Sequence, residues 1–262
     1  MKVLLCGDVS GRSGREVLKQ NLERYRNSVD FIMVNVDNAA HGFGITPTMV
    51  REILSWGADA LTGGNHLTDQ KEIFPILTSE KRLLKPANTS DKIPGLGVFE
   101  TQLPNGKKIV VVHLLGQKNM PMIGENPFTY MAELLKKYKL GVNAAAIIVD
   151  FHAEVTSEKV ALGHFLDGKV SAVVGTHTHV PTADWRILEH GTAYQTDLGM
   201  IGDYDSVIGM KKDVCVERFV SGYINGHLTP AMGKGTFYGL FVELDDKTGL
   251  AVNLDFIKHD YS

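Results

Sequence analysis

The chain has 262 residues, of which 44% are hydrophobic, and it carries 27 basic against 30 acidic residues. A chain of this size can bury a full core, so we expect one α/β domain over residues 1–262. A net charge of -3 gives no general electrostatic reason to hold a long polyanion, so no stable nucleic-acid complex is expected. Small anionic substrates remain open, because a metal site supplies its own positive charge.

The two cysteines and the N-terminus bear on the cellular compartment. Cys6 and Cys215 lie far apart and form no C-x-x-C pair, so a disulfide framework is not expected. The N-terminus lacks the apolar run of about seven residues that is typical of a signal peptide. Since no stretch approaches about 18 consecutive apolar residues, no membrane contact is expected. The sequence predicts a cytoplasmic protein and is compatible with a homo-oligomer.

Apolar runs alternate with amphipathic segments in the first 90 residues, which predicts βαβ units. The expected elements, in chain order, are a strand at Val3–Cys6, a helix at Arg15–Tyr25, a strand at Phe31–Val36, a helix at Thr48–Trp56 and a strand at Ala58–Leu61. Two extended runs then flank an Asn-Gly turn signal, which predicts a β-hairpin from Val98–Leu103 and Lys108–Leu115.

Alternation resumes after this hairpin, and the chain ends on a second one. The expected helices are Pro127–Tyr138, Ser157–Leu166 and Val214–Val220. The expected strands are Ala144–Val149, Val170–Val174, Thr192–Thr196, Phe237–Leu244 and Ala251–Ile257. Taken together, the elements predict an α/β/α sandwich with mixed β-sheets.

Five of the predicted strands break off into segments that contain metal-binding side chains. These side chains are Asp8, then Asp37 and Asn38, then Asn65 and His66, then His152, and finally His177 and His179. In an open α/β sheet, ligands bind beyond the carboxyl ends of the strands, so these tips would converge on one site. Carboxylates, amides and imidazoles without thiolate predict a mixed oxygen and nitrogen site for Fe, Mn or Zn rather than Ca.

Each segment also has a plainer interpretation when it is taken alone. Asp8 can cap the helix that follows it, and the glycine-rich segment 63–66 can be an ordinary turn. The two histidines of Gly175–His179 can lie on a solvated loop, although in an extended loop they point the same way and can approach a common centre. In Asp150–Glu154, either Asp150 or Glu154 can orient His152 through its second ring nitrogen, or each can be an ordinary polar side chain of a loop.

In this order the motifs resemble those of the calcineurin-like metallophosphoesterases. More narrowly, the chain is similar to a bacterial subgroup of that superfamily, the YmdB-like 2′,3′-cyclic-nucleotide phosphodiesterases. The motifs that carry the resemblance are Gly7–Val9, Asp37–Gly42, Gly64–His66, Asp150–Glu154 and Gly175–Val180. It extends over nearly the whole chain and includes Pro181–Asp184 and Thr192–Asp197.

The resemblance implies a metallophosphoesterase fold and a binuclear metal centre, with Fe or Mn as the expected ions and Zn or Mg as alternatives. One ion would be held by Asp8, Asp37, Asn38 and His179. The second would be held by Asp37, Asn65, His152 and His177. The implied reaction is hydrolysis of a small phosphodiester, such as a 2′,3′-cyclic nucleotide, by metal-activated water. His66 would be left free to protonate the departing ribose oxygen as a general acid.

The chain departs from the family pattern at two places. Where the superfamily has the motif D-x-H, this chain has Asp8-Val9-Ser10, and the subgroup also lacks the histidine. Asn38 would substitute for the missing histidine. Asp37 stands where the subgroup has Glu. Because Asp is one methylene shorter, the bridge must lie closer to the backbone by about 1.5 Å. We expect altered metal affinity more than lost activity.

Three rival functions remain beside the phosphodiesterase. A phosphomonoesterase or nucleotidase would use the same ligands. A regulatory metal-binding protein with incidental turnover would act by binding RNA or a partner. The modest net charge and the lack of an aromatic-basic stripe count against RNA binding. A purely structural site is disfavoured, because structural zinc centres are typically closed and rich in Cys.

Overall fold

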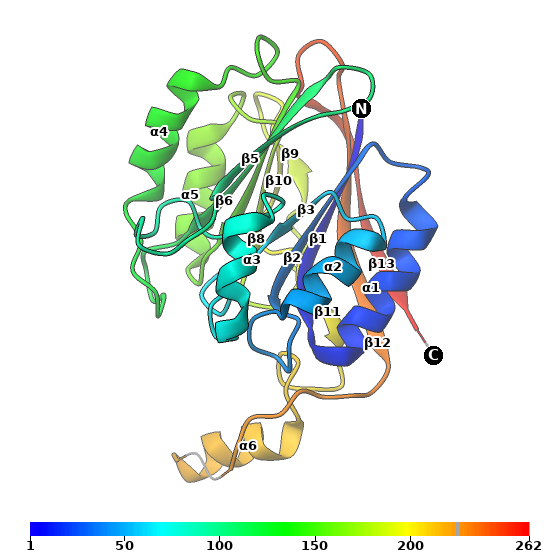
Figure 1. Ribbon diagram of the computed structural model, residues 1–262, viewed down its shortest axis with the longest axis vertical. Coiled ribbons are helices and arrows are strands. Elements are labelled where there is room, and N and C mark those ends of the chain that lie inside the picture. Colours follow the sequence, from blue (N-terminus) through cyan, green and yellow to red (C-terminus); the bar gives the residue numbers. More distant parts are fainter. Residues whose placement is uncertain (224–225, 262) are drawn as a thin grey trace.

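The strands of the protein form two mixed sheets that pack face to face in the computed structural model, which describes residues 1–223 and 226–261 (Figure 1). The first sheet has the order β13-β12-β11-β1-β2-β3-β4, with bounds Ala251–Asp260, Gly235–Leu244, Met200–Asp203, Lys2–Ser10, Phe31–Asn38, Ala60–Thr62 and Leu83–Leu84. The second has the order β5-β6-β7-β8-β10-β9, with bounds Val98–Gln102, Lys108–Leu115, Ala146–His152, Ala172–Thr176, Ala193–Gln195 and Arg186–Ile187.

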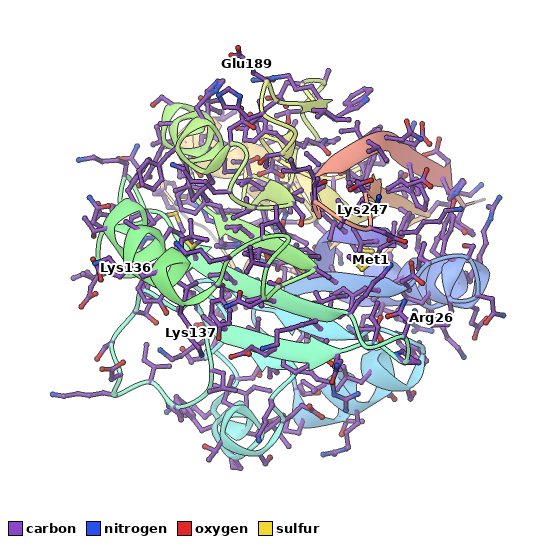
Figure 2. The ribbon with its side chains drawn as sticks, turned by 90° about the horizontal axis from the view of Figure 1, so that it is seen from above. Met1, Arg26, Lys136, Lys137, Glu189 and Lys247 are labelled. Atoms are coloured by element: carbon purple, nitrogen blue, oxygen red, sulfur yellow. The ribbon has the colours of Figure 1, made fainter. Side chains whose placement is uncertain are left out.

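Helices cover the outer face of each sheet. The first sheet is covered by α1 (Gly11–Tyr25), α2 (Pro47–Ser55) and the short α3 (Phe74–Ser79), which follows a 3-10 turn at Lys71–Ile73. The second is covered by α4 (Pro127–Lys137) and α5 (Thr156–Leu166). Figure 2 shows the layers from above, with the blue and green helices on opposite sides of the strands. The remaining helix, α6 (Lys212–Ser221), projects away from these layers (Figure 1).

The alternation of side chains along β1 shows how the layers share one core. Val3 and Leu5 pack between the two sheets, whereas Leu4 and Cys6 pack beneath the helices of the first sheet. Strands buried on both faces have near-continuous apolar sequences. This burial explains why the inner strands of both sheets appear in the sequence as uninterrupted apolar runs.

The predicted α/β/α sandwich with mixed sheets is confirmed, and its β layer consists of two sheets. The elements that the sequence did not indicate are all short: α3, β4, β9 and β11. Of these, β11 matters most, because it pairs in parallel with the site end of β1 at Asp8 and Val9. In the described part of the chain, no helix combines the length and apolar character needed to cross a membrane.

Candidate metal centre

The candidate ligands meet at the carboxyl ends of parallel strands from both sheets. Parallel pairing of β1 with β2, of β2 with β3, and of β7 with β8 brings these ends to one edge. The structure gathers all seven predicted ligands there: Asp8, Asp37, Asn38, Asn65, His152, His177 and His179. All are buried except His177, which is partly exposed. Strand topology therefore joins residues that lie far apart in the chain.

One ring nitrogen of His152 lies at the centre of the first group of donors. Its Nε2 atom lies 3.1 Å from Asn65 Oδ1, 3.2 Å from His177 Nδ1 and 3.3 Å from Asp37 Oδ2. Burial lowers the pKa of His177 to about 3, and the neighbouring His152 contributes to the shift. A neutral imidazole has a lone pair to offer, so this group can supply two nitrogens and two oxygens to one ion.

Asn38 and His179 form the second group. His179 Nε2 lies 3.1 Å from Asn38 Oδ1, while its Nδ1 lies 2.8 Å from the carbonyl oxygen of Ile208. The carbonyl fixes the proton on Nδ1 and leaves Nε2 as the coordinating atom. Asn38 Nδ2 donates to the Gly42 carbonyl at 2.9 Å, so the amide oxygen must face the site. Burial lowers the pKa of His179, which favours the neutral form that binds metals.

The two buried carboxylates have different surroundings. Asp8 Oδ2 accepts the backbone N–H of His177 at 3.1 Å, but Asp8 Oδ1 has no hydrogen-bond partner within the described residues. Burial, with the nearby charge of Asp197, raises the pKa of Asp8 well above its usual value. Burial would also raise the pKa of Asp37, but His152 and His66 lower it overall. A cation beside Asp8 would stabilise its ionised form.

The donor set fits transition-metal ions. It combines carboxylate and amide oxygens with neutral imidazoles. It also includes the buried Oδ1 atom of Asp8, which accepts no hydrogen bond from the described residues. Over residues 1–223 and 226–261, no group of three or more His, Cys, Asp or Glu side chains is arranged as a ready ion cage. The donors contact one another, so a bound ion would have to displace these contacts.

A buried hydroxyl connects His152 to the carboxylate of Asp150. His152 Nδ1 lies 3.0 Å from Thr176 Oγ1, which donates to Asp150 Oδ1 at 2.8 Å. Burial opposes ionisation of Asp150, but the adjacent His113 outweighs it and the pKa falls to about 2. Asp150 therefore orients His152 through Thr176 rather than directly. Glu154, the other candidate for that role, contacts His177 instead, with Oε2 at 3.2 Å from Nε2.

A buried ion pair supports the loop that carries His177 and His179. Lys159 Nζ lies 2.6 Å from Asp197 Oδ2 and 2.8 Å from the Thr176 carbonyl oxygen, and both charged side chains are 1% exposed. Asp197 in turn accepts the backbone N–H groups of Thr178 and Gly199. No sequence signal marked Lys159, since a lysine in an amphipathic helix is usually solvated.

His66 lies beside the donors and faces a cavity. Its backbone N–H lies 3.1 Å from both carboxylate oxygens of Asp37, and its ring Nδ1 lies 2.7 Å from Asp69 Oδ2. The ring packs edge-on against Phe43, with centroids 5.0 Å apart. The cavity measures about 280 Å³ and is lined by Asn38, Phe43, His66, Glu154, His177, Thr178, His179, Ile208, Met210 and Leu228. The lining thus combines candidate donors with apolar side chains.

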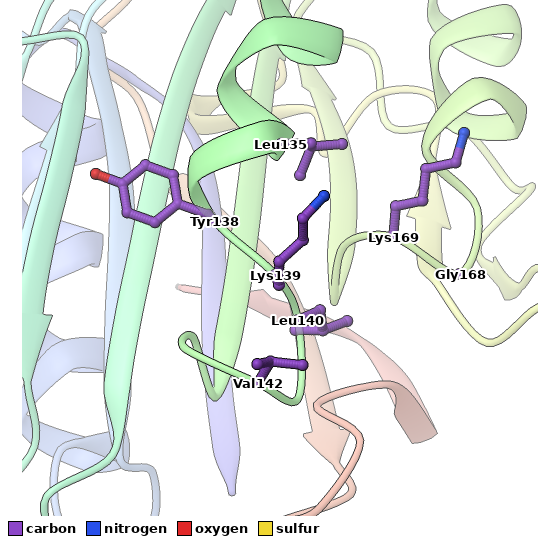
Figure 3. Close-up of a pocket in the computed structure, with 7 residues that line it drawn as sticks. All are labelled: Leu135, Tyr138, Lys139, Leu140, Val142, Gly168 and Lys169. Carbon is purple, nitrogen blue, oxygen red and sulfur yellow. The ribbon is translucent and has the colours of Figure 1, made fainter.

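A larger cavity lies elsewhere and has a different character. It has a volume of about 440 Å³. Figure 3 shows its lining beside α4: Leu135, Tyr138, Lys139, Leu140, Val142, Gly168 and Lys169. This lining includes none of the candidate ligands. The smaller cavity is therefore the better candidate for a substrate site, because reactive groups converge on it.

The alternative role of Asp8 as a helix cap is wrong. Ser10 occupies the N-cap position of α1, and Asp8 Oδ2 accepts a hydrogen bond from the His177 backbone instead. The segment Gly63–His66 does form a turn-rich loop, yet Asn65 and His66 both face the other candidate residues. A turn and a site are therefore compatible here.

Comparison with known proteins places the chain in a family. Residues 4–257 match the model of the YmdB-like proteins. The chain belongs to this family. A YmdB-like relative, the 2′,3′-cyclic-nucleotide 2′-phosphodiesterase of Bacillus subtilis (strain 168), is 41% identical over 257 residues, which cover 97% of this chain and 96% of that protein. The predicted YmdB-like family is confirmed.

Two crystal structures of similar chains have nearly the same backbone. A hypothetical protein from Thermus thermophilus is 34% identical, with a TM-score of 0.93 and full coverage of both chains. A protein described as a novel phosphatase from Mycoplasma pneumoniae is 33% identical, with a TM-score of 0.92 over 100% of this chain and 94% of the other. The YmdB-like fold is thus matched along its whole length.

Proposed function

We propose that this YmdB-like protein is a phosphodiesterase that hydrolyses 2′,3′-cyclic nucleotides with two metal ions, iron or manganese, with zinc or magnesium as alternatives. The observation that carries the proposal is the convergence of seven oxygen and nitrogen donors beside one cavity. The name of the Bacillus subtilis relative supports the substrate class.

The family resemblance implies how the donors would be shared. Asp8, Asp37, Asn38 and His179 would hold one ion, and Asp37, Asn65, His152 and His177 would hold the other. Two such ions supply a nucleophile at neutral pH and polarise the phosphoryl oxygens. Thr176 and the Ile208 carbonyl keep His152 and His179 turned so that their Nε2 atoms face the site.

His66 is the candidate general acid. Asp69 engages its Nδ1, so Nε2 is the ring nitrogen left for the substrate. The side chain is 29% exposed and lines the cavity, so it can exchange protons with solvent between turnovers. Protonation of the departing ribose oxygen by such a group is worth about 10² to 10⁴ in rate.

Activity and metal content measured on the same preparations test the proposal. Protein purified without chelator should contain about two transition-metal ions per chain and should convert 2′,3′-cyclic AMP to a nucleoside monophosphate. His66→Ala should lower this rate by about 10² to 10⁴ and affect bis-p-nitrophenyl phosphate much less, because nitrophenolate leaves without a proton. His190→Ala, at an exposed histidine, is the matched control. Equal losses on both substrates would exclude the acid role.

A phosphomonoesterase at the same site is the second candidate, because the Mycoplasma pneumoniae structure is described as a phosphatase. The set of metal-binding side chains indicates the type of reaction, but it says less about which phosphoester is the substrate. Phosphate release from 2′-AMP and 3′-AMP, compared with opening of 2′,3′-cyclic AMP, separates the two. Faster turnover of the monoesters would replace the diesterase proposal.

A further inference from the structure

The candidate cavity holds apolar side chains as well as metal donors. Phe43, Ile208, Met210 and Leu228 line it together with His66. Ile208 is 52% exposed, and Phe43 and Leu228 are partly exposed. A single exposed apolar side chain needs no explanation, but several that meet in one cavity beside reactive groups indicate a ligand with an apolar part. We call Phe43, Ile208, Met210 and Leu228 the apolar lining.

We propose that the apolar lining binds the nucleobase of the substrate, and that the base stacks on Phe43. This inference rests on the phosphodiesterase proposed above and specifies which part of the nucleotide the protein recognises. Stacking on an aromatic side chain is favourable for every base, because every base has a π-face. In a 2′,3′-cyclic nucleotide the base and the phosphate are joined to the same ribose. A nucleotide held at the metal donors therefore carries its base close to them.

The apolar lining lies one contact away from the donors at two points. Phe43 packs edge-on against His66, whose backbone N–H lies 3.1 Å from both carboxylate oxygens of Asp37. The carbonyl oxygen of Ile208 lies 2.8 Å from Nδ1 of His179. A ligand that extends over the length of a ribose can therefore contact the donors and the apolar lining together.

The loop that carries Phe43 is fixed on several sides. The Phe43 N–H donates to the Ala40 carbonyl at 2.9 Å, and the Phe43 carbonyl accepts a hydrogen bond from Gln70 Nε2 at 2.9 Å. The preceding Gly42 lies so close to Met210 that an added Cβ atom would be 2.5 Å from Met210 Cε. The aromatic ring is thus held on an ordered backbone before a ligand arrives, which lowers the entropic cost of binding.

The charges of the cavity favour a base over a second phosphate group. None of the described residues that line the cavity is Lys or Arg, the side chains that usually bind phosphate, whereas Glu154 contributes a carboxyl group. Phe43, Ile208 and Leu228 have no polar side-chain atoms, so they can contact the face of a base but cannot hydrogen-bond to its edge. We therefore expect a preference for substrates that carry a base, with weak discrimination among adenine, guanine, cytosine and uracil.

Two cyclic phosphates that differ only in the base test the proposal. They are 2′,3′-cyclic AMP and methyl β-D-ribofuranoside 2,3-cyclic phosphate, in which a methoxy group replaces adenine. For wild type, kcat/KM should be about 5-fold to 150-fold higher for 2′,3′-cyclic AMP, as expected for stacking of one base. Phe43→Ala should remove most of this preference. Ile208→Asn should reduce it and keep the backbone carbonyl that contacts His179.

The ratio of the two kcat/KM values separates base binding from an effect on the proposed general acid. A change that acts only through His66 affects both substrates alike, because both release a ribose oxygen, and it cancels in the ratio. Phe74→Ala, at a phenylalanine that is 39% exposed and does not line the cavity, is the matched control and should keep the wild-type ratio. Circular dichroism of each variant checks that the fold is intact.

Saturation-transfer difference NMR with adenosine gives a second measurement, which needs no turnover. The protons of the adenine ring should receive saturation from wild type. Phe43→Ala should weaken this transfer, and Phe74→Ala should leave it unchanged.

The outcomes distinguish the inference from the proposed reaction. Equal kcat/KM values for the two cyclic phosphates in wild type would overturn the inference and leave the phosphodiesterase in place. Hydrolysis of neither compound, with saturation of adenine that depends on Phe43, would support the base site and refute the reaction. Absence of both hydrolysis and saturation would refute both proposals. A preference for the base that Phe43→Ala leaves intact, or that Phe74→Ala removes equally, would also overturn the inference.

Discussion

Replacing Thr176 by Val tests whether a buried hydroxyl orients the proposed ligand His152. Valine keeps the shape of threonine but lacks the Oγ1 atom. In the protein this atom lies 3.0 Å from His152 Nδ1 and donates to Asp150 Oδ1 at 2.8 Å. The substitution therefore leaves an imidazole N–H without its acceptor and a carboxylate oxygen without a donor, both in a fully buried setting.

The expected magnitudes follow from these contacts. Leaving buried polar groups unsatisfied should lower the free energy of unfolding by about 1–3 kcal/mol. The imidazole would also lose its preferred orientation toward the site. Changes to groups that orient a metal ligand typically cost about 10-fold to 100-fold in metal affinity. We expect Thr176→Val to weaken Mn²⁺ binding within that range.

Isothermal titration of metal-free protein with Mn²⁺, together with urea unfolding, measures both effects. Thr192→Val is the matched control, because Thr192 is equally buried and its Oγ1 bonds Val170 O at 2.8 Å and Gly168 N at 2.9 Å, away from the site. It should lose similar stability and keep wild-type metal affinity. The reasoning fails if Thr176→Val binds Mn²⁺ as tightly as wild type, or if Thr192→Val weakens binding as much.

Three further predictions concern other parts of the chain. Lys159→Met leaves Asp197 charged and buried, so urea unfolding should show a loss of about 3–5 kcal/mol; a loss below about 1 kcal/mol would contradict this. Asp37→Glu should change Mn²⁺ affinity more than turnover. Metal analysis of the variant that shows no change from wild type would refute this expectation. Hydrogen bonds, of which the one from Tyr138 contributes most, lower the pKa of Glu100 to about 2. The stability that ionised Glu100 adds to the folded protein is therefore present above about pH 4.3 and is lost as the pH falls toward 2. The stability difference between Glu100→Gln and wild type should therefore shrink on acidification, and a constant difference would be inconsistent.

The sequence indicated where the candidate site lies, because strand ends have a clear signature. Asp8 and Asp37 each follow an apolar run closely, and parallel topology brings the ends of such runs to one edge. The long-range contacts between the sheets did not have to be known. It was enough that each run was too apolar for a surface strand and ended at a metal-binding side chain.

The supporting contacts could not be predicted in the same way. Thr176 lies 26 residues from Asp150, and Lys159 lies 38 residues from Asp197. A hydroxyl or a lysine in such a segment has many solvated alternatives, and only the packed tertiary structure excludes them. Short strands such as β9 were missed for a related reason: two residues carry no periodic pattern, so their pairing depends on the neighbouring strand.

Ile208 illustrates a feature that is unexpected from sequence and is explained by the site. Val207 and Met210 exchange backbone hydrogen bonds at 2.8 and 2.9 Å, which makes Ile208 and Gly209 the centre of a tight turn with φ values of 46° and 97°. Turns with two positive φ values favour Asn or Gly at the first position, and a β-branched residue there is strained. The Ile208 side chain lines the candidate cavity, and its carbonyl oxygen fixes Nδ1 of His179. Asn at this position would relieve the strain and would keep the backbone carbonyl, so the backbone contact alone does not explain the isoleucine. We therefore expect the Ile208 side chain to provide an apolar surface for the substrate of the candidate site.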